Sequence, residues 1–467
     1  MNPFRPERTR LVHEVRATVR LALPLIAAQL AAVGSNVIDA VLAGHVSAHV
    51  LGAVAVGASI WSLAIVCGIG MMMAVPPSVA QLDGAGRRGE VGAVFHQALW
   101  LALGMGALLW FAVRHAQPLI ELIGVTPSLR HDVQRFLLAI SWGAPALTCY
   151  FALRGLSEGL SLTRPSMYFS LGGLVLLVPL GYVLMFGKLG IPPQGAHGCG
   201  VATAIVLWLE MLAFGVYVMF RRNYRGLGLF ERFEWPDLPR IGALVHIGAP
   251  MAVTLLAEAG LFVAAALIIA TLGEDVIASH QVAINIASLF FMIPLGLAMA
   301  ITVRVGNAVG RGDEQGVRYA GFCGIGLTLG TQTLSATLML GLPHFIASLY
   351  THDTRVIALA AQLIMLAGLF QFSDGIQVAA NGALRGLKDT RVPMVITLFS
   401  YWMVGMPVGW WLAFHHGMGA RGMWVGLIAG LSVAAVMLFT RFWRSAWKQR
   451  WRTVAMTTAA RPVTLDA

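Results

Sequence analysis

Residues 153–165 read LRGLSEGLSLTRP, and residues 384–393 read LRGLKDTRVP. Both stretches open with LRGL, continue to a Thr-Arg step and follow a long apolar segment. Similar short matches occur in the same order elsewhere in the chain, each separated by roughly 230 residues, which is the mark of an internal duplication. They pair Gly86-Arg87 with Gly310-Arg311, Pro179-Leu180-Gly181 with Pro407-Val408-Gly409, and Gly195-Ala196 with Gly419-Ala420.

The composition is that of a membrane protein. Of 467 residues, 58% are hydrophobic and only 11% are charged, and the mean hydropathy is +0.75. Soluble proteins carry roughly a quarter charged residues, so this composition excludes a water-soluble fold as well as collagen and disulfide scaffolds. The four cysteines show no paired spacing, and we expect neither a metal site nor a redox site from them.

Twelve apolar stretches are long enough to cross a hydrocarbon layer as helices, which takes about 20 residues each. None alternates as a barrel strand would, and open strands would leave backbone groups unpaired in lipid. The sequence therefore predicts an all-α polytopic protein with spans near 21–43, 50–75, 93–113, 132–153, 168–187, 198–220, 242–271, 277–303, 318–342, 356–384, 392–414 and 422–440.

Basic residues predict the orientation of these spans. With the N-terminus in the cytoplasm, most of the 32 Lys and Arg residues fall on the cytoplasmic side, as the positive-inside rule requires. Both termini are then cytoplasmic, and we expect a multi-pass protein of a bacterial inner membrane. The opposite side receives only Arg114, Arg130, Arg135, Lys188, Arg355 and Arg421.

The repeat divides the chain. Because six spans separate matching motifs, the two copies have the same topology and should be related by an axis along the membrane normal. We expect two similar six-helix bundles that can rock about a shared cleft, which is the architecture of alternating access. The predicted parts are a cytoplasmic segment 1–20, a bundle 21–220, a cytoplasmic linker 221–241, a second bundle 242–442 and a cytoplasmic tail 443–467.

Acidic residues inside the predicted spans are the candidate functional groups. An ionisable group at bilayer depth costs at least ~2.5–3.5 kcal/mol on insertion scales, so each needs a reason to be there. Asp39, Glu258 and Asp374 favour a functional interpretation, whereas packing remains the stronger reading for Glu210, which has no polar neighbour in VLWLEMLAF. The role of Glu210 stays open at this point.

Polar companions distinguish these acids. Asp374 shares a helical face with amides three residues to either side, Asp39 has an amide three residues earlier, and the eighth span carries two amides four residues apart. Such stripes should face a water-filled cleft rather than lipid. The companions are Gln371 and Gln377 for Asp374, Asn36 for Asp39, and Gln281 and Asn285 in the eighth span.

A buried carboxylate can hold a proton, a sodium ion or an organic cation, and we expect these to compete for it. The chain has no Walker A motif, because GAGRRGE lacks the GK[ST] ending. It also lacks the HExxH motif of zinc proteases, so no enzyme is predicted and no cofactor is expected. The energy should come from a gradient of Na⁺ or H⁺, with a possible Na⁺ site at Glu258 and Asp374.

Several longer motifs resemble the multidrug and toxic compound extrusion (MATE) family, with most similarity to its NorM branch. They include MAVPPSVAQLDGAGRRGEV (73–91), ASHQVAINIASLFFMIPLG (278–296) and SDGIQVAANGALRGLKDTRVPM (373–394). The resemblance runs from about residue 20 to residue 445. It implies two six-helix bundles that form a V-shaped cleft, in a protein that exchanges sodium ions or protons for organic cations.

The resemblance also implies site residues. Asp374 matches the family's tenth-helix aspartate, Glu258 its seventh-helix glutamate and Asp39 its first-helix aspartate. The chain departs from the family at Phe370, where a tyrosine is common, and this departure removes an oxygen ligand. Leu177 and Gly181 replace amides that some members carry on the fifth helix.

The sequence thus predicts a secondary active antiporter that exports amphipathic organic cations. The alternative is a flippase for lipid-linked sugars from the wider superfamily. Its pyrophosphate substrate would call for arginines in the cleft, whereas the arginines here lie near helix ends or in loops. Expected partners are cationic drugs and dyes and membrane lipid, with no nucleic acid, and the protein is expected to be a monomer.

Overall fold

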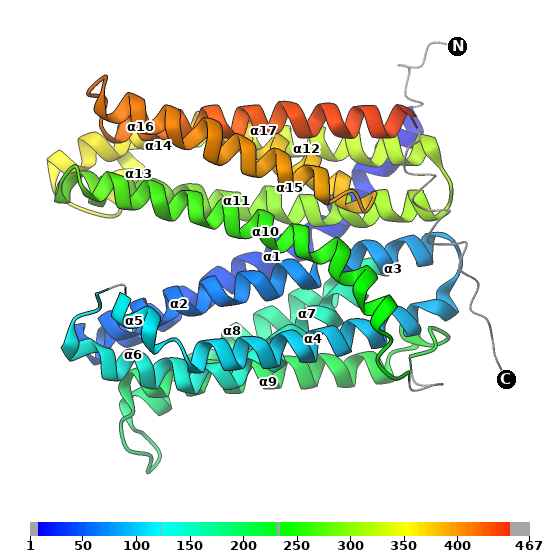
Figure 1. Ribbon diagram of the computed structural model, residues 1–467, viewed down its shortest axis with the longest axis horizontal. Helices are drawn as coiled ribbons and strands as arrows, with labels where there is room; N and C mark the ends of the chain where they lie inside the picture. Colours follow the sequence, from blue (N-terminus) through cyan, green and yellow to red (C-terminus); the bar gives the residue numbers. More distant parts are fainter. Residues whose placement is uncertain (1–7, 123, 230, 232–233, 449–467) are drawn as a thin grey trace. The chain divides into compact units, whose positions relative to one another are not determined.

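The computed structural model describes residues 8–122, 124–229, 231 and 234–448, and in these ranges the secondary structure is helical (Figure 1). The predicted all-α fold is confirmed. Residues 1–7 of the predicted N-terminal segment and 449–467 of the predicted tail lie outside the described residues. In the first half the elements are α1 Arg8–Val46, α2 Ala48–Met72, α3 Val75–Gly84, η1 Arg88–Glu90, α4 Val91–Arg114, α5 Gln117–Leu122, α6 Pro127–Ile140, η2 Ser141–Gly143, α7 Ala144–Gly159, α8 Arg164–Phe186, α9 Gly195–Phe220 and η3 Arg222–Tyr224.

The second half continues the same pattern of long helices joined by short turns. Its elements are α10 Leu238–Ala270, α11 Glu274–Gly310, α12 Glu314–Gly341, α13 Pro343–Ser348, α14 Thr354–Gly386, α15 Arg391–Leu398, the π-helix η4 Phe399–Gly405, α16 Met406–Phe414 and α17 Ala420–Lys448.

Among the described residues, 11 helical stretches are long and apolar enough to cross a membrane. Four of them are composite: α2 with α3, η1 with α4, α6 through α7, and α15 through α16. The helix α12 occupies the place of the predicted ninth span and is 28 residues long. It is not among the 11, and its sequence includes Glu314, Gln315, Arg318 and Gln332, which lower its hydropathy.

Contacts divide the chain into two compact units. One unit takes the described residues within 1–26, 80–86 and 257–467, and the other takes those within 27–79 and 87–256. In the first, α14 packs against α11, α12 and α17; in the second, α8 packs on α9 and α4 on α7. Boundaries fall inside α1, α3 and α10, so each of these helices belongs to both units.

The start of α1 is fixed within the first unit by ion pairs. The guanidinium of Arg10 donates to Asp313 at 2.8 Å, and Arg304 donates to the buried carboxylate of Glu14. Asp313 also caps α12 by accepting from the backbone N–H of Gly316 at 2.8 Å. One carboxylate therefore stabilises a helix N-terminus and holds α1 against it.

The linker between the halves packs against α4. The backbone N–H of Gly92 donates to the carbonyl of Leu227 at 2.7 Å, and Leu227 is 1% exposed. Gln97 donates to the carbonyl of Trp235 and accepts from the N–H of Asp237. Since the amide of Gln97 satisfies both backbone groups, this connection is held in place although its sequence reads as a basic loop.

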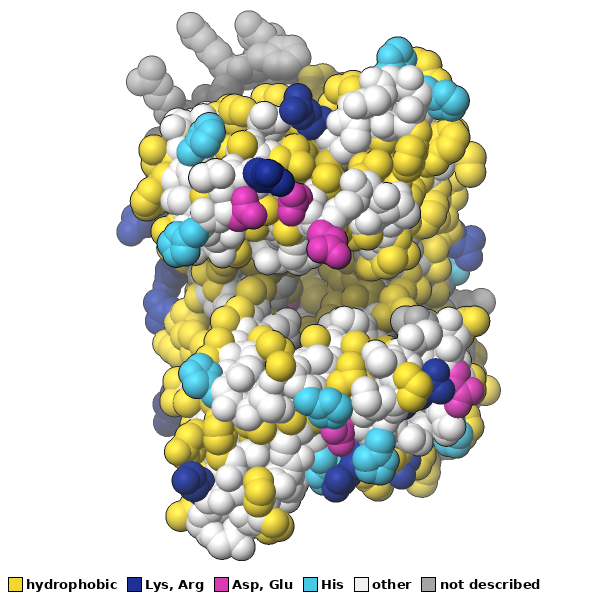
Figure 2. Space-filling view, turned by 90° about the vertical axis from the view of Figure 1, so that its left-hand side faces the viewer, with side chains coloured by type: hydrophobic (Ala, Val, Ile, Leu, Met, Phe, Trp, Pro, Cys, Tyr) yellow, Lys and Arg dark blue, Asp and Glu magenta, His cyan; other side chains and the backbone are white. Residues whose placement is uncertain are grey.

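Figure 2 looks at the end of the helices where α5 and α6 lie, and Lys and Arg side chains are sparse on this face while histidines are scattered over it. This agrees with the uneven distribution of basic residues in the sequence. The repeat is also visible in the backbone. Ser161 and Lys388, each two residues before a Thr-Arg step, have φ of 62° and 59°.

Close helix packing depends on small residues in both units. A Cβ added at Gly382 of α14 would lie 2.5 Å from the carbonyl oxygen of Ala298 on α11. At the same place, Thr302 donates to the carbonyl of Gly382 at 2.8 Å. Membrane helices associate through such close contacts because lipid supplies no hydrophobic driving force between them.

We predict that Gly382→Ala lowers the thermal stability of the purified protein. Overpacking a tight contact typically costs about 1–3 kcal/mol. Gly104 in α4 is the matched control, because a Cβ there meets nothing within 4 Å. Gly104→Ala should be neutral or slightly stabilising, since alanine favours the helix. Thermal melting in detergent measures both, and equal melting temperatures would contradict the packing argument.

Candidate functional site

The main candidate site is centred on one face of α14. Gln371, Asp374 and Gln377 recur at intervals of three, so they lie on the same side of the helix. They are 0%, 2% and 1% exposed, respectively. The sequence predicted these three residues as one polar stripe, and the structure buries that stripe within the first unit.

Neighbouring helices add oxygen atoms to this stripe. The side-chain amide of Gln332, on α12, donates to the side-chain oxygen of Gln371 at 2.6 Å and to its backbone carbonyl at 3.0 Å. Among the described residues, the Oε1 atoms of Gln332 and Gln377 accept no hydrogen bond although they are buried. These oxygens are therefore available to a bound cation or to water.

The second carboxylate comes from α10. Glu258 lies near enough to Asp374 for the two charges to interact, and Arg385 of α14 interacts electrostatically with Glu258. Tyr401 is fully buried in the π-helix η4, within electrostatic range of both carboxylates. Its hydroxyl has no hydrogen-bond partner in the part of the chain that the structure describes.

An aromatic cluster in the same unit contains Phe370, the residue that stands where the family often has tyrosine. Phe370 is 3% exposed, and its ring packs edge-on against Phe262 at 6.1 Å and Trp424 at 5.9 Å between centroids. The indole of Trp424 donates to Nδ1 of His280 at 3.2 Å. His280 is thus held as an acceptor within the core.

The second unit holds the third predicted acid. Asp39 on α1 accepts from the hydroxyl of Thr203 on α9 at 3.3 Å and from the thiol of Cys199, one turn away on the same helix. Its Oδ1 atom is buried with no partner among the described residues. Asn36 lies one turn earlier on α1 and is exposed.

The amides of the eighth span bind each other. Gln281 donates to Asn285 at 3.1 Å on an exposed face of α11. The structure records no hydrogen bond between this pair and Glu258 or Asp374 within the described residues. The predicted site residues therefore form separate groups: the α14 stripe with Glu258, the Asp39 group, and the Gln281–Asn285 pair.

Sequence reasoning missed a buried charge network in the second unit. Arg154 and Glu158 pair at 2.6 Å and are 4% and 2% exposed, and Arg154 also donates to Gln29 on α1 at 3.0 Å. Glu210 interacts electrostatically with Arg154, so it does have a polar companion, supplied by another helix. The available signal was the spacing of four between Arg154 and Glu158.

The helix that carries Arg154 and Glu158 is hydrogen-bonded to the linker between two hydroxyl groups. Ser157 on α7 and Tyr224 in η3 are 2.8 Å apart, oxygen to oxygen. Burial raises the pKa of Tyr224 to about 12, so its hydroxyl stays protonated and able to donate. The hydrogen bond therefore ties the connection between the halves to the buried end of α7.

Comparison with known protein families shows which family the chain belongs to. The sequence profile of the MatE family matches residues 24–183 and 250–411. The chain belongs to the MatE family. The two matched stretches also agree with the two copies of the repeat.

Individual MatE proteins resemble the chain over nearly all of its length. It is 47% identical to the "Probable multidrug resistance protein NorM" of Xanthomonas campestris pv. campestris, with 93% of the chain and 94% of the relative covered. It is 44% identical to the "Multidrug resistance protein PmpM" of Pseudomonas aeruginosa, covering 94% and 93%. The crystal structure of the eukaryotic MATE transporter AtDTX14 has the same fold, with a TM-score of 0.87 at 21% identity, covering 95% of the chain and 98% of that structure.

We predict that Glu210→Gln has little effect on stability, because Arg154 keeps its ion pair with Glu158. Glu158→Gln is the matched variant and should be far more damaging. It removes the short contact of a buried arginine, a loss that typically costs about 3–5 kcal/mol. Thermal melting and membrane expression of the two variants test this. Greater damage from Glu210→Gln would show that Glu210 is the principal counter-ion.

Proposed function

We propose that this chain is a multidrug efflux antiporter that exports amphipathic organic cations in exchange for Na⁺ or H⁺. The observation that carries the proposal is the charge balance around α14. Two carboxylates, Glu258 and Asp374, interact with each other. Among the described residues, Arg385 is the one guanidinium that acts electrostatically on this pair, and it acts on Glu258. One negative charge is left over, and a buried charge is costly unless a cation neutralises it.

Three kinds of cation suit this cluster. A proton neutralises a carboxylate directly, and a sodium ion is suited to the oxygen atoms that the site presents. The free oxygens of Gln332, Gln377 and Tyr401 support an ion with several oxygen ligands. An organic cation would supply the same charge together with apolar surface, and Phe372, two residues before Asp374 on α14, is a half-buried aromatic side chain in the same unit. The coupling ion itself stays a proposal.

Exchange follows from competition for one charge. When an ion from outside neutralises the carboxylates, the drug loses its counter-charge and is released. When the drug binds from inside, it displaces the ion. Each ligand therefore lowers the affinity of the other by the same factor. The curated relatives carry "multidrug resistance protein" in their names, which supports drugs as the exported class.

The flippase alternative receives less support. A pyrophosphate group needs arginines that are free to bind it. Of the buried arginines, Arg154 pairs with Glu158, and Arg385 acts on Glu258. Both guanidinium groups thus already have carboxylates nearby, and the surplus charge of the α14 site is negative.

The orientation is part of the proposal. We place both termini in the cytoplasm of a bacterial cell and the chain in the inner membrane as a monomer. The concentration of basic residues near one set of helix ends supports this orientation, and the bacterial relatives support the membrane.

We predict that Asp374→Asn abolishes drug efflux while leaving a folded protein in the membrane. Asparagine keeps the size of the side chain and removes the charge that the cation needs. Glu258→Gln should uncouple drug movement from the ion gradient. Resistance in an efflux-deficient host and ion-stimulated drug release from vesicles measure these effects. Wild-type resistance with Asp374→Asn would contradict the assigned role.

We also predict that a cationic dye binds the purified protein less tightly as pH falls, as the sodium concentration rises, or both. Protonation or sodium removes the negative charge, so dye affinity should drop by roughly the 5–150-fold typical of coupled sites. Fluorescence titration across pH and sodium concentration measures it, with an anionic dye as control. Binding that is indifferent to both ions, or better binding of the anionic dye, would contradict the exchange mechanism.

A further inference from the structure

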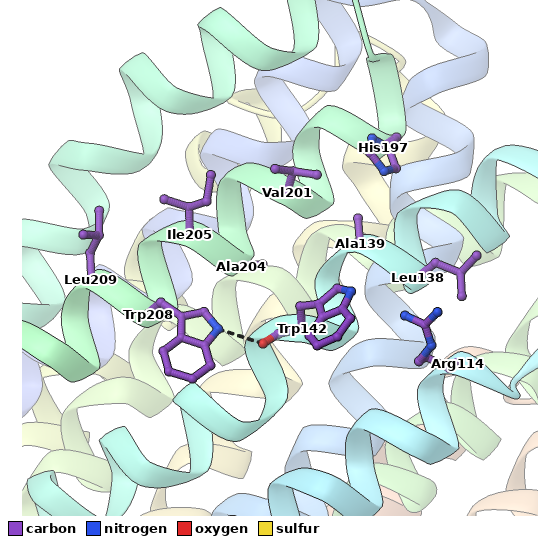
Figure 3. Close-up of a pocket in the computed structure, with 10 residues that line it drawn as sticks. All are labelled: Arg114, Leu138, Ala139, Trp142, His197, Val201, Ala204, Ile205, Trp208 and Leu209. Atoms are coloured by element: carbon purple, nitrogen blue, oxygen red, sulfur yellow. Dashed lines mark hydrogen bonds between the residues drawn. The ribbon is translucent and has the colours of Figure 1, made fainter.

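A groove of about 590 Å³ opens on the surface of the second unit, among α4, α6, η2 and α9 (Figure 3). This volume is within the range of sites that bind small ligands. None of its lining residues belongs to the Asp39 group or to the Arg154 network. Its lining residues are Arg114, Leu138, Ala139, Trp142, His197, Val201, Ala204, Ile205, Trp208 and Leu209.

A short 3-10 segment in the fourth span forms one wall of the groove. Between α6 and α7 the chain forms the 3-10 segment η2, Ser141–Gly143, and Trp142 projects from it. The indole N–H of Trp208 donates to the backbone carbonyl of Trp142 at 2.9 Å, drawn as the dashed line in Figure 3. In a membrane such a carbonyl needs a partner, and the bond also fixes the two indoles relative to each other.

The groove follows a single stripe of α9. His197, Val201, Ile205 and Trp208 recur at intervals of three or four, so they lie on one face. From His197 to Trp208 the helix rises about 16 Å. Small Ala204 lies between the larger side chains and leaves room above the helix. The groove thus runs along the axis of α9 and is long enough to hold much of an acyl chain.

The apolar part opens outward rather than into the core. Trp142 is 57% exposed, Trp208 39% and Leu209 42%. The helices that carry them are long and apolar enough to cross a membrane. These exposed surfaces would therefore contact lipid chains and not water.

Two arginines lie at the end of the groove where His197 is, away from Trp208 and Leu209. The guanidinium of Arg114, in the last turn of α4, lies over the rings of Trp110 at 5.0 Å and Trp142 at 5.7 Å. Arg135 on α6 is exposed and acts electrostatically on His197. Among the described residues no carboxylate forms a salt bridge with Arg114 or Arg135. Asp132, three residues before Arg135 on α6, binds His49. Stacking holds Arg114 in place while its N–H groups stay available.

We propose that this groove binds one phospholipid with an anionic headgroup. Its phosphate lies at Arg114 and Arg135, and an acyl chain follows Trp142, Val201 and Ile205 towards Trp208. Tryptophan and arginine are the residues expected where headgroup and hydrocarbon meet, and a guanidinium binds phosphate in a bidentate manner. An organic cation would be repelled by two arginines, and free phosphate would leave the apolar channel unfilled. The site is independent of the transport substrate.

The test is lipid retention by the purified protein. The wild type and variants are equilibrated with equal amounts of phosphatidylglycerol and phosphatidylcholine in detergent and examined by native mass spectrometry. We expect the wild type to retain phosphatidylglycerol preferentially. Arg114→Gln should reduce that preference about tenfold, the loss expected for a hydrogen bond to a charged group. Lys188→Gln, which changes an exposed cation outside the groove, is the matched control and should behave as the wild type.

Two further variants separate the groove from simple surface charge. Val201→Phe fills the channel and keeps both arginines, so it should release the lipid. Arg135→Gln changes an exposed side chain, so the variant should fold. It should also weaken the preference for phosphatidylglycerol, and it keeps the proposal testable should Arg114→Gln fail to fold.

Three outcomes would overturn the proposal. The first is equal retention of both lipids by the wild type. The second is wild-type retention by Val201→Phe. The third is that inorganic phosphate displaces the bound lipid as effectively as added phosphatidylglycerol does.

Discussion

A polypeptide inside a hydrocarbon layer has to satisfy its backbone hydrogen bonds from within the protein, and the rest of this structure follows from that constraint. Regular helices meet it directly. Where a span departs from the α-helix, a side chain takes over, as Trp208 does for the carbonyl of Trp142 at η2. Where helices approach closely, glycine allows the contact, as Gly382 does against Ala298.

Buried charges obey a similar constraint, and the two copies of the repeat meet it differently. Arg154 pairs with Glu158, four residues later on the same helix. In the second copy the turn before the Thr-Arg step is shorter. The residue four after Arg385 is Asp389, and its carboxylate accepts from Arg441 at 2.9 Å. Arg385 acts on Glu258 of α10 instead. The arginine of the second copy thus interacts with an acid on another helix, and this acid is a candidate cation ligand.

The sequence alone predicted the helical class, the spans and the α14 stripe, because hydropathy and a spacing of three or four are local properties. It could not predict which helix completes each group. Gln332 and Tyr401 lie far from Asp374 in sequence, and no local pattern marks them. Glu210 read as solitary because its companion Arg154 comes from another helix. Gln281 and Asn285 were grouped with the acids by polarity, and in the structure they hydrogen-bond to each other.

The two compact units are joined mainly through helices. The chain passes from one to the other within α1, α3 and α10 and at the turn between Gly86 and Arg87. A helix is stiff, except where proline removes a hydrogen bond. Pro24 precedes the boundary in α1 and Pro250 that in α10. At these two crossings a change in the direction of the chain therefore has to bend a helix, at a cost set by the stiffness of that helix and not by the slack of a loop.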